Sequence, residues 1–195
     1  MNPEPKPAMK LTRHVAKLRD ALKCPVSRCL IADPVVAGDG FVYERMCIEA
    51  RLDFGHVMSP TTGAVLPHSG LAPAPLALAA LVLLEEIDAQ LRVPAAAFVR
   101  VHGKWRLGGT DAIFKRHTTA LQETLLCPIT RERMQTPATT VDGHVFERQH
   151  IERWFALGHA TSPMTGILLL PLLSDAPLAR ALQTLLDDTC ATEYS

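Results

Sequence analysis

The sequence predicts an α+β fold that is built twice. When the 195-residue chain is shifted by 103 positions, Arg13–Leu66 aligns with Arg116–Leu169 without a gap, and 22 of the 54 paired residues are identical. In each copy, short β-prone runs flank an Asp-Gly dipeptide, and helical patterns precede and follow them. Each copy is therefore expected to hold a complete small fold.

The repeat divides the chain into a first domain over 11–91, a linker over 92–109 and a second domain over 110–190. Each domain has roughly 80 residues, near the lower limit for a single hydrophobic core. Each copy must therefore have a tightly packed core, or the two copies must pack against each other. Gly108-Gly109 indicates a flexible joint. The basic and aromatic residues before it could dock a partner, although a linker packed on a neighbouring domain is the simpler interpretation.

The predicted elements follow one order in both copies. The first copy is expected to contain a helix over Leu11–Leu22, strands Pro34–Val36 and Phe41–Tyr43 around Asp39-Gly40, a central helix over Arg45–Phe54 and a closing helix over Pro75–Leu91. The second is expected to contain a helix over Asp111–Leu125 capped by Thr110, strands Ala138–Val141 and His144–Phe146, a central helix over Arg148–Leu157, a strand near Leu168–Leu170 and a closing helix over Ala176–Asp188. Gly55 and Gly158 stand where the central helices need a left-handed cap.

The closing helix Leu76–Leu91 is apolar around most of its circumference, whereas a surface helix needs only one apolar stripe. Either the other copy or a second chain is expected to cover it, which includes a homodimer through this helix. Burial within its own domain is the less favoured alternative because the domain is small.

Composition excludes several classes of protein. The 20 basic and 20 acidic residues cancel, which argues against nucleic-acid and membrane-surface binding. Met1–Lys10 lacks the pattern of a signal peptide, and the uncharged stretch Leu71–Leu84 is too short and proline-broken to cross a bilayer. Of the five cysteines only Cys24 recurs, as Cys127, so we expect reduced thiols and a cytoplasmic location.

Neither a metal site nor a nucleophile is expected. Structural zinc needs four ligands, usually in close cysteine pairs, and the candidate ligands differ between the copies. They are Cys24, Cys29, Cys47 and His56 in the first, and Cys127, His144, His150 and His159 in the second. Cys24 and Cys127 follow apolar residues and precede proline, which predicts buried thiols. No carboxylate is placed to orient His56 or His159, so we expect no catalytic residue and no cofactor.

One ordered set of short motifs remains. In the second copy it reads Leu126-Cys127-Pro128-Ile129-Thr130, Asp142-Gly143, Phe146-Glu147-Arg148 and Thr161-Ser162-Pro163-Met164-Thr165-Gly166. In the first copy it reads Cys24-Pro25-Val26-Ser27, Asp39-Gly40, Tyr43-Glu44-Arg45 and Ser59-Pro60-Thr61-Thr62-Gly63. This set resembles the U-box, the metal-free relative of the RING domain found in ubiquitin ligases. Two U-boxes in so short a protein resemble the secreted effectors of intracellular bacteria, which would place the protein in the cytosol of a host cell.

The resemblance implies two loops held without metal. Hydrogen bonds and ion pairs, each worth about 1 kcal/mol net, must then act together. The candidate loop-stabilising residues are Asp142, Glu147, Arg148, His159, Ser162 and Thr165.

The resemblance also implies a shallow groove for a ubiquitin-conjugating enzyme charged with ubiquitin. Its expected residues are Ile129, Trp154 and Pro163 in the second copy, and Val26, Arg51 and Pro60 in the first. Arg131 and Arg28 stand where the family is often apolar, and we expect them to affect which conjugating enzyme is chosen. Gly166 and Gly63 stand where many members place a basic or polar side chain that helps to hold the charged complex closed.

The predicted function is that of a ubiquitin ligase, with a conjugating enzyme, ubiquitin and a protein substrate as partners. Arg51 puts a charge where an apolar groove floor is expected, so the second copy is the better candidate for recruiting the conjugating enzyme. The first would bind a substrate or the other copy. Two alternatives stay open: a non-catalytic adaptor or inhibitor that uses the folds as binding modules, and a zinc-dependent RING-like protein.

Overall fold

The computed structural model describes residues 7–91, 98–101, 104–107 and 110–191, with side chains over 12–89 and 114–188. The helices are α1 (Pro7–Ala21), α2 (Arg45–Asp53), α3 (Pro75–Leu91), α4 (Thr110–Thr124), α5 (Arg148–Ala156) and α6 (Pro177–Ala191). The strands are β1 (Pro34–Val36), β2 (Val42–Glu44), β3 (Ala72–Pro73), β4 (Phe98–Val101), β5 (Lys104–Leu107), β6 (Pro137–Thr140), β7 (Val145–Glu147) and β8 (Leu173–Asp175). The predicted α+β class is confirmed.

Each copy forms a three-stranded antiparallel sheet with the same topology. The strand order is β2-β1-β3 in the first copy and β7-β6-β8 in the second. The predicted hairpins are confirmed, and their turns place Gly40 and Gly143 at φ values of 79° and 83°. The central helices α2 and α5 follow the hairpins directly. They end before Gly55 and Gly158, whose positive φ values confirm the predicted left-handed caps.

The strand predicted near Leu168–Leu170 is wrong. Leu168 forms only an isolated bridge with Thr161, and the third strand is β8, Leu173–Asp175, which pairs with β6. The reason is local: Thr161–Leu168 closes a tight turn in which Gly166 N–H donates to the Ser162 carbonyl at 2.9 Å. The chain needs several further residues to return to the sheet. The helix predicted from Leu11 begins earlier, at Pro7.

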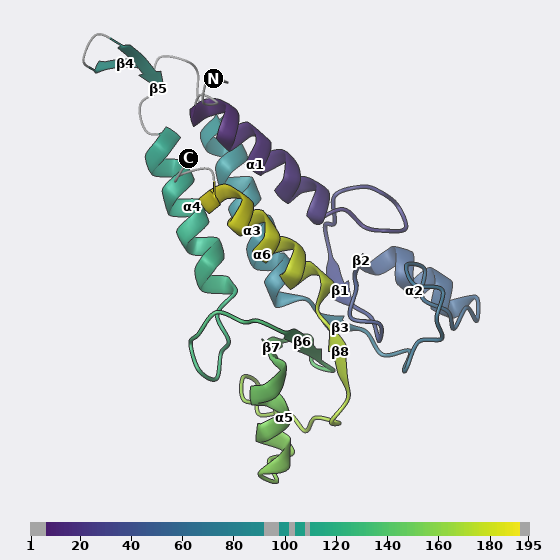
Figure 1. Cartoon of the computed structure of the whole chain (residues 1–195). Coiled ribbons are helices and arrows are strands. Elements are labelled where there is room, and N and C mark those ends of the chain that lie inside the picture. The colour runs from purple at the N-terminus through teal and green to yellow at the C-terminus, as the bar shows by residue number, and fades with distance from the viewer. Residues whose placement is uncertain (1–6, 92–97, 102–103, 108–109, 192–195) are drawn as a thin grey trace.

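The segment expected to be only a linker contains a hairpin. Strand β4 pairs with β5 in antiparallel register, from Phe98↔Leu107 to Val101↔Lys104, and Figure 1 shows it at the end of the helices remote from both sheets. The sequence contains a signal for this hairpin, since polar and apolar residues alternate over Val99–Val101 and Lys104–Leu107 on either side of His102-Gly103. Gly108-Gly109, the predicted joint, lies outside the described residues.

The two copies share a core made by four long helices. Helices α1, α3, α4 and α6 lie side by side in Figure 1, and α1 contacts all of the other three. Buried leucines from both copies fill the interior, among them Leu18, Leu84, Leu121 and Leu182, each at most 1% exposed. The other copy therefore covers much of α3, as the apolar circumference of that helix predicts. Among the described residues, no helix combines the length and apolarity that crossing a bilayer requires.

Two equivalent histidines are buried in this bundle. His14 and His117 are each 2% exposed, and the His14 ring packs edge-on against Phe114 with 5.4 Å between ring centroids. Burial lowers the pKa of His14 to about 4, and the nearby positive charges of protonated His117 and Lys17 act in the same direction. His14 is therefore neutral at pH 7, and its protonation works against folding.

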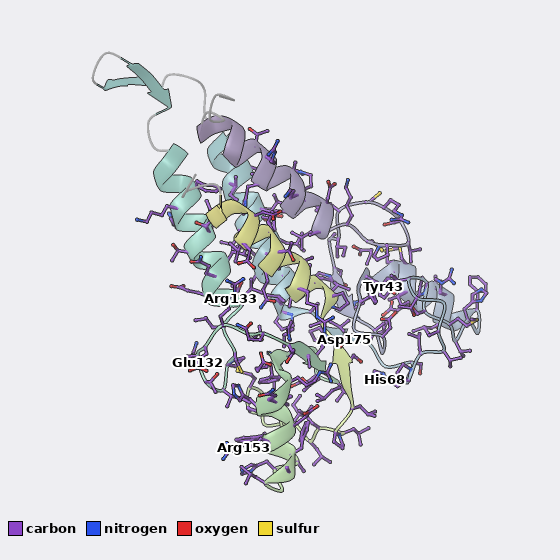
Figure 2. All side chains as sticks on the ribbon, in the orientation of Figure 1. Tyr43, His68, Glu132, Arg133, Arg153 and Asp175 are labelled. Atoms are coloured by element: carbon purple, nitrogen blue, oxygen red, sulfur yellow. The ribbon has the colours of Figure 1, made fainter. Side chains whose placement is uncertain are left out.

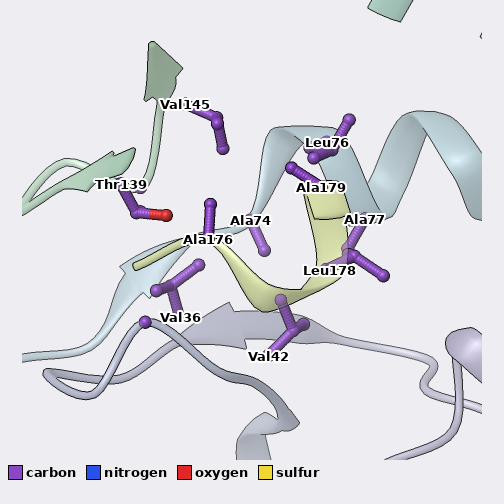
Figure 3. A pocket seen from close by; sticks show the side chains of 12 residues that line it. Val36, Val42, Ala74, Leu76, Ala77, Thr139, Val145, Ala176, Leu178 and Ala179 are labelled. Atoms are coloured by element: carbon purple, nitrogen blue, oxygen red, sulfur yellow. The ribbon is translucent and has the colours of Figure 1, made fainter. Parts of the chain in front are cut away.

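The hairpin turn of each copy contacts the third strand of the other. A Cβ atom at Gly40 would lie 1.9 Å from the Asp175 carbonyl oxygen, and one at Gly143 would lie 1.8 Å from that of Pro73. Ser174 Oγ also donates to the Gly38 carbonyl at 2.8 Å. Figure 3 shows apolar side chains from both copies closing this junction, where the remaining cavity is only about 10 Å³. The copies thus form one unit, and α2 and α5 project from it in different directions (Figure 1).

Candidate functional site

The loops on either side of each central helix are built on the same turn. In the second copy, the first loop runs from Leu126 to Arg133 and the second from Thr161 to Leu168, and a β-bridge joins the ends of each. Arg131 N–H donates to the Cys127 carbonyl at 2.8 Å in the first loop, as Gly166 N–H does to Ser162 in the second. The fold therefore places two similar turns beside one helix.

The leading residue of each turn accepts hydrogen bonds with its side chain. Ser162 Oγ accepts from the backbone N–H groups of Met164 and Thr165, both at 3.2 Å. Cys127 Sγ accepts from the N–H of Glu147 at 3.4 Å. Burial raises the pKa of the Cys127 thiol, but this backbone bond, the His150 side chain and the amides of Thr130 and Ile129 more than offset it, so the pKa is lowered.

Cys127 thus has the same role in the first loop as Ser162 has in the second, because the side chain of each accepts a backbone N–H. Cys127 is 1% exposed and Cys24 is fully buried, so the predicted buried thiols are confirmed. Cys24 repeats the pattern by accepting the Glu44 N–H at 3.4 Å. The described cysteines Cys24, Cys29, Cys47 and Cys127 are free thiols. Within the described ranges, His, Cys, Asp and Glu side chains do not gather in threes or more where a metal ion could be held.

Glu147 fixes the exit of the first loop. Its carboxylate accepts the Gln135 N–H at 2.5 Å and the Thr136 N–H at 3.0 Å, and it also binds the Thr136 hydroxyl. Burial opposes its ionisation, but these bonds outweigh burial and lower the pKa of Glu147. Glu44 makes the equivalent bonds in the first copy, to the N–H groups of Ala32 and Asp33 at 2.7 and 3.2 Å. A glutamate carboxylate at this position therefore anchors the exit of the first loop in both copies.

Asp142 connects the hairpin turn to the second loop. Its carboxylate accepts from Thr140 Oγ1 at 2.5 Å and from Thr165 Oγ1 at 3.1 Å. Burial opposes ionisation of Asp142, but the hydroxyls of Thr140, Ser162 and Thr165 and the charge of His144 outweigh it and lower the pKa. The carboxylate of a hairpin aspartate thus holds a loop about 20 residues further along the chain through hydrogen bonds.

The first copy makes the same connection through a tyrosine. Tyr43 OH donates to Asp39 Oδ2 and lies 2.8 Å from Thr61 Oγ1, and the ring is fully buried. Burial is the main reason that the pKa of Tyr43 rises to about 12. Figure 2 shows Tyr43 in the body of the first copy. Phe146 occupies the equivalent position in the second copy, and there Thr165, the counterpart of Thr62, binds the aspartate directly.

The side chains of Arg148 and His159 contact elements next to the loops. Arg148 pairs with Asp175 on β8 at 2.8 Å and approaches Glu152 at 4.0 Å. Figure 2 shows Asp175 close to the junction of the two copies. The His159 ring stacks on Trp154 with 4.0 Å between centroids and an interplanar angle of 24°. His159 therefore supports the predicted groove floor.

The three predicted groove residues of the second copy are Ile129 in the first loop, Trp154 on α5 and Pro163 in the second loop, and all are half-buried. Trp154 Nε1–H donates to the Thr161 carbonyl at 2.8 Å, which ties the indole to the second loop. Trp154 and Ile129 pack against one buried cluster that contains Cys127, Phe146 and Ile151. A fixed aromatic side chain therefore lies in contact with the second loop and with the core beneath the first. We call Ile129, Trp154 and Pro163 the tip surface.

The same positions in the first copy have different chemistry. Val26 is 37% exposed, Pro60 is half-buried, and Arg51 replaces the tryptophan. The Nε atom of Arg51 is buried and makes no hydrogen bond within the described part of the chain. An unpaired guanidinium nitrogen costs free energy unless a partner supplies an acceptor. The two copies therefore offer different surfaces to a partner.

Arg131 and Arg28 share an uncommon backbone conformation. Both have φ of 61°, the left-handed region in which the second loops use Gly166 and Gly63. A residue with a Cβ atom costs roughly 1 kcal/mol or more there. Both arginines are exposed, so the turn projects a cation outward next to the tip surface.

Some contact residues were not predicted. Thr136, Thr140 and Tyr43 make decisive hydrogen bonds, and all lie within or directly before the hairpin strands β2 and β6. The repeat does not indicate these contacts, because the equivalent residues differ between the copies. Thr136 aligns with Asp33, which instead accepts a hydrogen bond from Arg45 Nε at 2.6 Å. The copies thus keep the carboxylate of Glu44 and Glu147 and vary the groups around it.

Comparison with known proteins assigns the family. The model of the U-box domain matches residues 19–80 and 122–177, which together make up more than half of the chain. This chain belongs to the U-box family.

The similarity to these relatives covers less than a third of this chain. The chain is 44% identical over 54 residues to U-box domain-containing protein 12 of Oryza sativa subsp. japonica, covering 28% of this chain and 9% of that protein. It is 50% identical over 44 residues to WD repeat, SAM and U-box domain-containing protein 1 of Danio rerio, covering 23% and 9%. It is 43% identical over 54 residues to E3 ubiquitin-protein ligase SPL11 of Oryza sativa subsp. japonica, covering 28% and 8%. The chain therefore spans a small fraction of each relative's length.

Proposed function

We propose that this protein is a U-box ubiquitin ligase whose second copy binds a ubiquitin-charged conjugating enzyme through the tip surface. It would bring the thioester close to a substrate lysine and contribute proximity and orientation, without a covalent intermediate on the ligase. Family membership and the name of one relative support the ligase activity. The observation that carries the assignment to the second copy is Trp154, a half-buried indole fixed by a hydrogen bond at 2.8 Å.

The hydrogen bonds that hold the loops support the same mechanism. Glu147 and Asp142 anchor the two loops through hydrogen bonds to backbone and hydroxyl groups. Loops fixed in this way present a preorganised surface, which reduces the entropic cost of binding. We expect the interaction to survive a chelator for that reason.

The non-catalytic adaptor or inhibitor is the second candidate. It is favoured by Gly166 and Gly63, which leave no side chain at the position where many U-boxes hold the charged complex closed. Under this proposal the tip surface binds the conjugating enzyme but does not promote transfer.

An autoubiquitination assay with a panel of conjugating enzymes, run with and without EDTA, separates these candidates. Ubiquitin chains that form in EDTA and disappear with Ile129→Ala, but persist with the matched Val26→Ala, support the proposed ligase. Saturable binding of a conjugating enzyme without chains would support the adaptor. Loss of the fold in EDTA would support the zinc-dependent alternative.

The remaining assignments rest on the family and the architecture. We propose that the partners are a conjugating enzyme, ubiquitin and a protein substrate. We propose that the protein acts in the cytosol, which for a secreted bacterial effector means that of a host cell. A homodimer through Leu76–Leu91 stays a prediction, although the four-helix core leaves only part of that helix free.

A further inference from the structure

Helices α3 and α4 leave an open apolar groove on the outside of the four-helix core. The groove has a volume of about 600 Å³. Its lining residues are Pro75, Leu78, Ala79, Val82, Leu83, Ala120, Glu123 and Thr124. Leu78 and Val82 are 54% and 47% exposed, which is unusual for two apolar side chains one turn apart on a helix otherwise packed in a core.

The equivalent surface between helices α1 and α6 is polar, and an ion pair bridges it. Helices α3 and α6 both begin with proline after alanine, so Leu78 corresponds to Arg180 and Val82 to Thr184. Ala120 corresponds to Lys17, which pairs with Asp188 across the gap between α1 and α6 at 2.6 Å. The duplicated fold therefore does not require the exposed leucine and valine of α3.

The charges around the groove are also unbalanced. Asp188, the partner of Lys17, corresponds to Glu86, one turn beyond Val82, and Ala120 takes the place of that lysine in the sequence. Glu123 lines the groove at its other end. Its counterpart Asp20 pairs with Lys23 at 2.7 Å, whereas the residue in the place of Lys23 is Leu126. No ion pair of Glu86 or Glu123 exists within the described residues.

One cation shares this surface. Arg116 stands one turn before Ala120 on α4, near the Glu86 end, and its charge opposes that of Glu86 in the effect on the pKa of His117. The Glu86 end is therefore close to neutral, and the net negative charge lies at the Glu123 end. A ligand that fits must present apolar side chains along Leu78 and Val82 and a cation next to Glu123.

We propose that this groove binds an amphipathic helical segment of a protein substrate, with apolar residues on one face and a lysine or arginine at the end nearest Glu123. This inference rests on the proposed ligase function. Eight lining residues suit a peptide-sized ligand, whereas a stable protein–protein interface uses about 20–30 residues a side. A second copy of this chain would also bring the same carboxylates to the interface.

The position of the groove fits this role. Thr124 lines the groove and precedes Ile129 of the tip surface by five residues. Because an extended chain spans at most about 3.6 Å per residue, the groove ends within roughly 18 Å of Ile129. A substrate bound there is held next to the copy that recruits the conjugating enzyme.

A direct binding measurement tests this without ubiquitin transfer. The probe is a fluorescent 16-residue helical peptide with leucines at helical spacing on one face and lysines on the other, and the comparison peptide carries glutamates in place of the lysines. We expect saturable anisotropy changes with the lysine peptide and at least tenfold weaker binding of the glutamate peptide. Leu78→Arg with Val82→Thr, which installs the residues of the other side, should weaken lysine-peptide binding at least tenfold. Arg180→Ala with Thr184→Ala is the matched control and should change it less than twofold.

The Glu123→Lys variant distinguishes a site that selects its ligand by charge from a nonspecific apolar surface. It should weaken the lysine peptide several-fold and improve the glutamate peptide, with thermal unfolding as the check that each variant folds. Equal binding of both peptides, absence of saturable binding, or unchanged binding by the Leu78→Arg, Val82→Thr variant would overturn the proposal. So would a dimer in sedimentation that this variant dissociates, since the occupant would then be a second copy. Each readout is independent of chain formation, so failure here leaves the ligase assignment standing.

Discussion

The two copies keep the same loop mechanics but differ at the surface that the loops present. Glu44 and Glu147 anchor their first loops through equivalent backbone bonds, and Cys24 and Cys127 accept equivalent amides. The central helix nevertheless carries Arg51 in one copy and Trp154 in the other. The comparison teaches that the carboxylate and the thiol that hold the first loop are the same in both copies, whereas the central-helix position of the proposed binding surface differs.

The junction between the copies should be the most sensitive to substitution. Gly143→Ala places a Cβ atom 1.8 Å from the Pro73 carbonyl, at a residue with φ of 83°. We expect a loss of at least about 4 kcal/mol in the free energy of unfolding, measured by urea denaturation. Gly40→Ala should cost a similar amount because its turn makes the reciprocal contact. Gly158→Ala is the control for the φ effect alone, since open space surrounds that residue. If all three variants lost the same small amount, the junction would not be close-packed.

Acidification should destabilise the shared bundle. The folded His14 has a pKa of about 4, against about 6.5 when unfolded, so between these values the unfolded chain binds the proton and the folded chain does not. Stability should fall by about 3 kcal/mol as the pH drops from 6.5 to 4, since each pKa unit is worth about 1.4 kcal/mol. His14→Gln should flatten this part of the curve, and equivalent His117→Gln should do so to a smaller extent. An unchanged pH profile for His14→Gln would contradict the account.

The anchoring carboxylates should matter equally in the two copies. Glu147→Gln weakens charge-assisted bonds to the Gln135 and Thr136 amides, and Glu44→Gln weakens the bonds to Ala32 and Asp33. We expect each to lower the free energy of unfolding by about 2 kcal/mol. The lowered pKa of Glu147 means that its contribution is present above the unfolded pKa, about 4.3, and is lost as the pH falls through the folded one. Urea melts at pH 7 and pH 3 check this, and a larger deficit of Glu147→Gln at pH 3 would contradict it.

The smallest expected effect is at the exposed arginine of the first loop. Arg131→Gly removes a Cβ atom from a residue with φ of 61° and should stabilise the protein by up to about 1 kcal/mol. The same change should alter the relative affinities for different conjugating enzymes, because the side chain lies beside the tip surface. Arg28→Gly should stabilise the protein without altering those affinities. A panel of binding measurements with thermal melts decides the point, and identical selectivity profiles would reject a role for Arg131.

Much of this structure could be predicted because the duplication gives every signal twice. Asp-Gly turns, glycine caps and the Cys-Pro and Ser-Pro motifs recur in register, so they predict the hairpins and the central helices to within a residue or so of their bounds. The third strand was misplaced because Ile167-Leu168-Leu169-Leu170 is apolar enough to indicate a strand, although Leu168 only closes a turn with Thr161. The β4–β5 hairpin was missed because it lies outside the repeat.

The contacts between the copies could not be predicted from the sequence. Nothing in one hairpin indicates that Gly40 lies against Asp175, because that proximity depends on how four helices pack. The bundle also rules out a comparison of the two copies as isolated domains. Separate copies would expose the buried faces of α1, α3, α4 and α6, so the copies are better compared by substitution within the intact chain.

The most direct test is the affinity of the intact protein for a conjugating enzyme after substitution at the two equivalent central-helix positions, measured by calorimetry. Trp154→Ala should weaken binding about thirtyfold, as expected for an aromatic anchor worth about 2 kcal/mol, while Arg51→Ala should change it less than threefold. If Arg51→Ala abolished binding and Trp154→Ala left it intact, the assignment of the tip surface to the second copy would be contradicted.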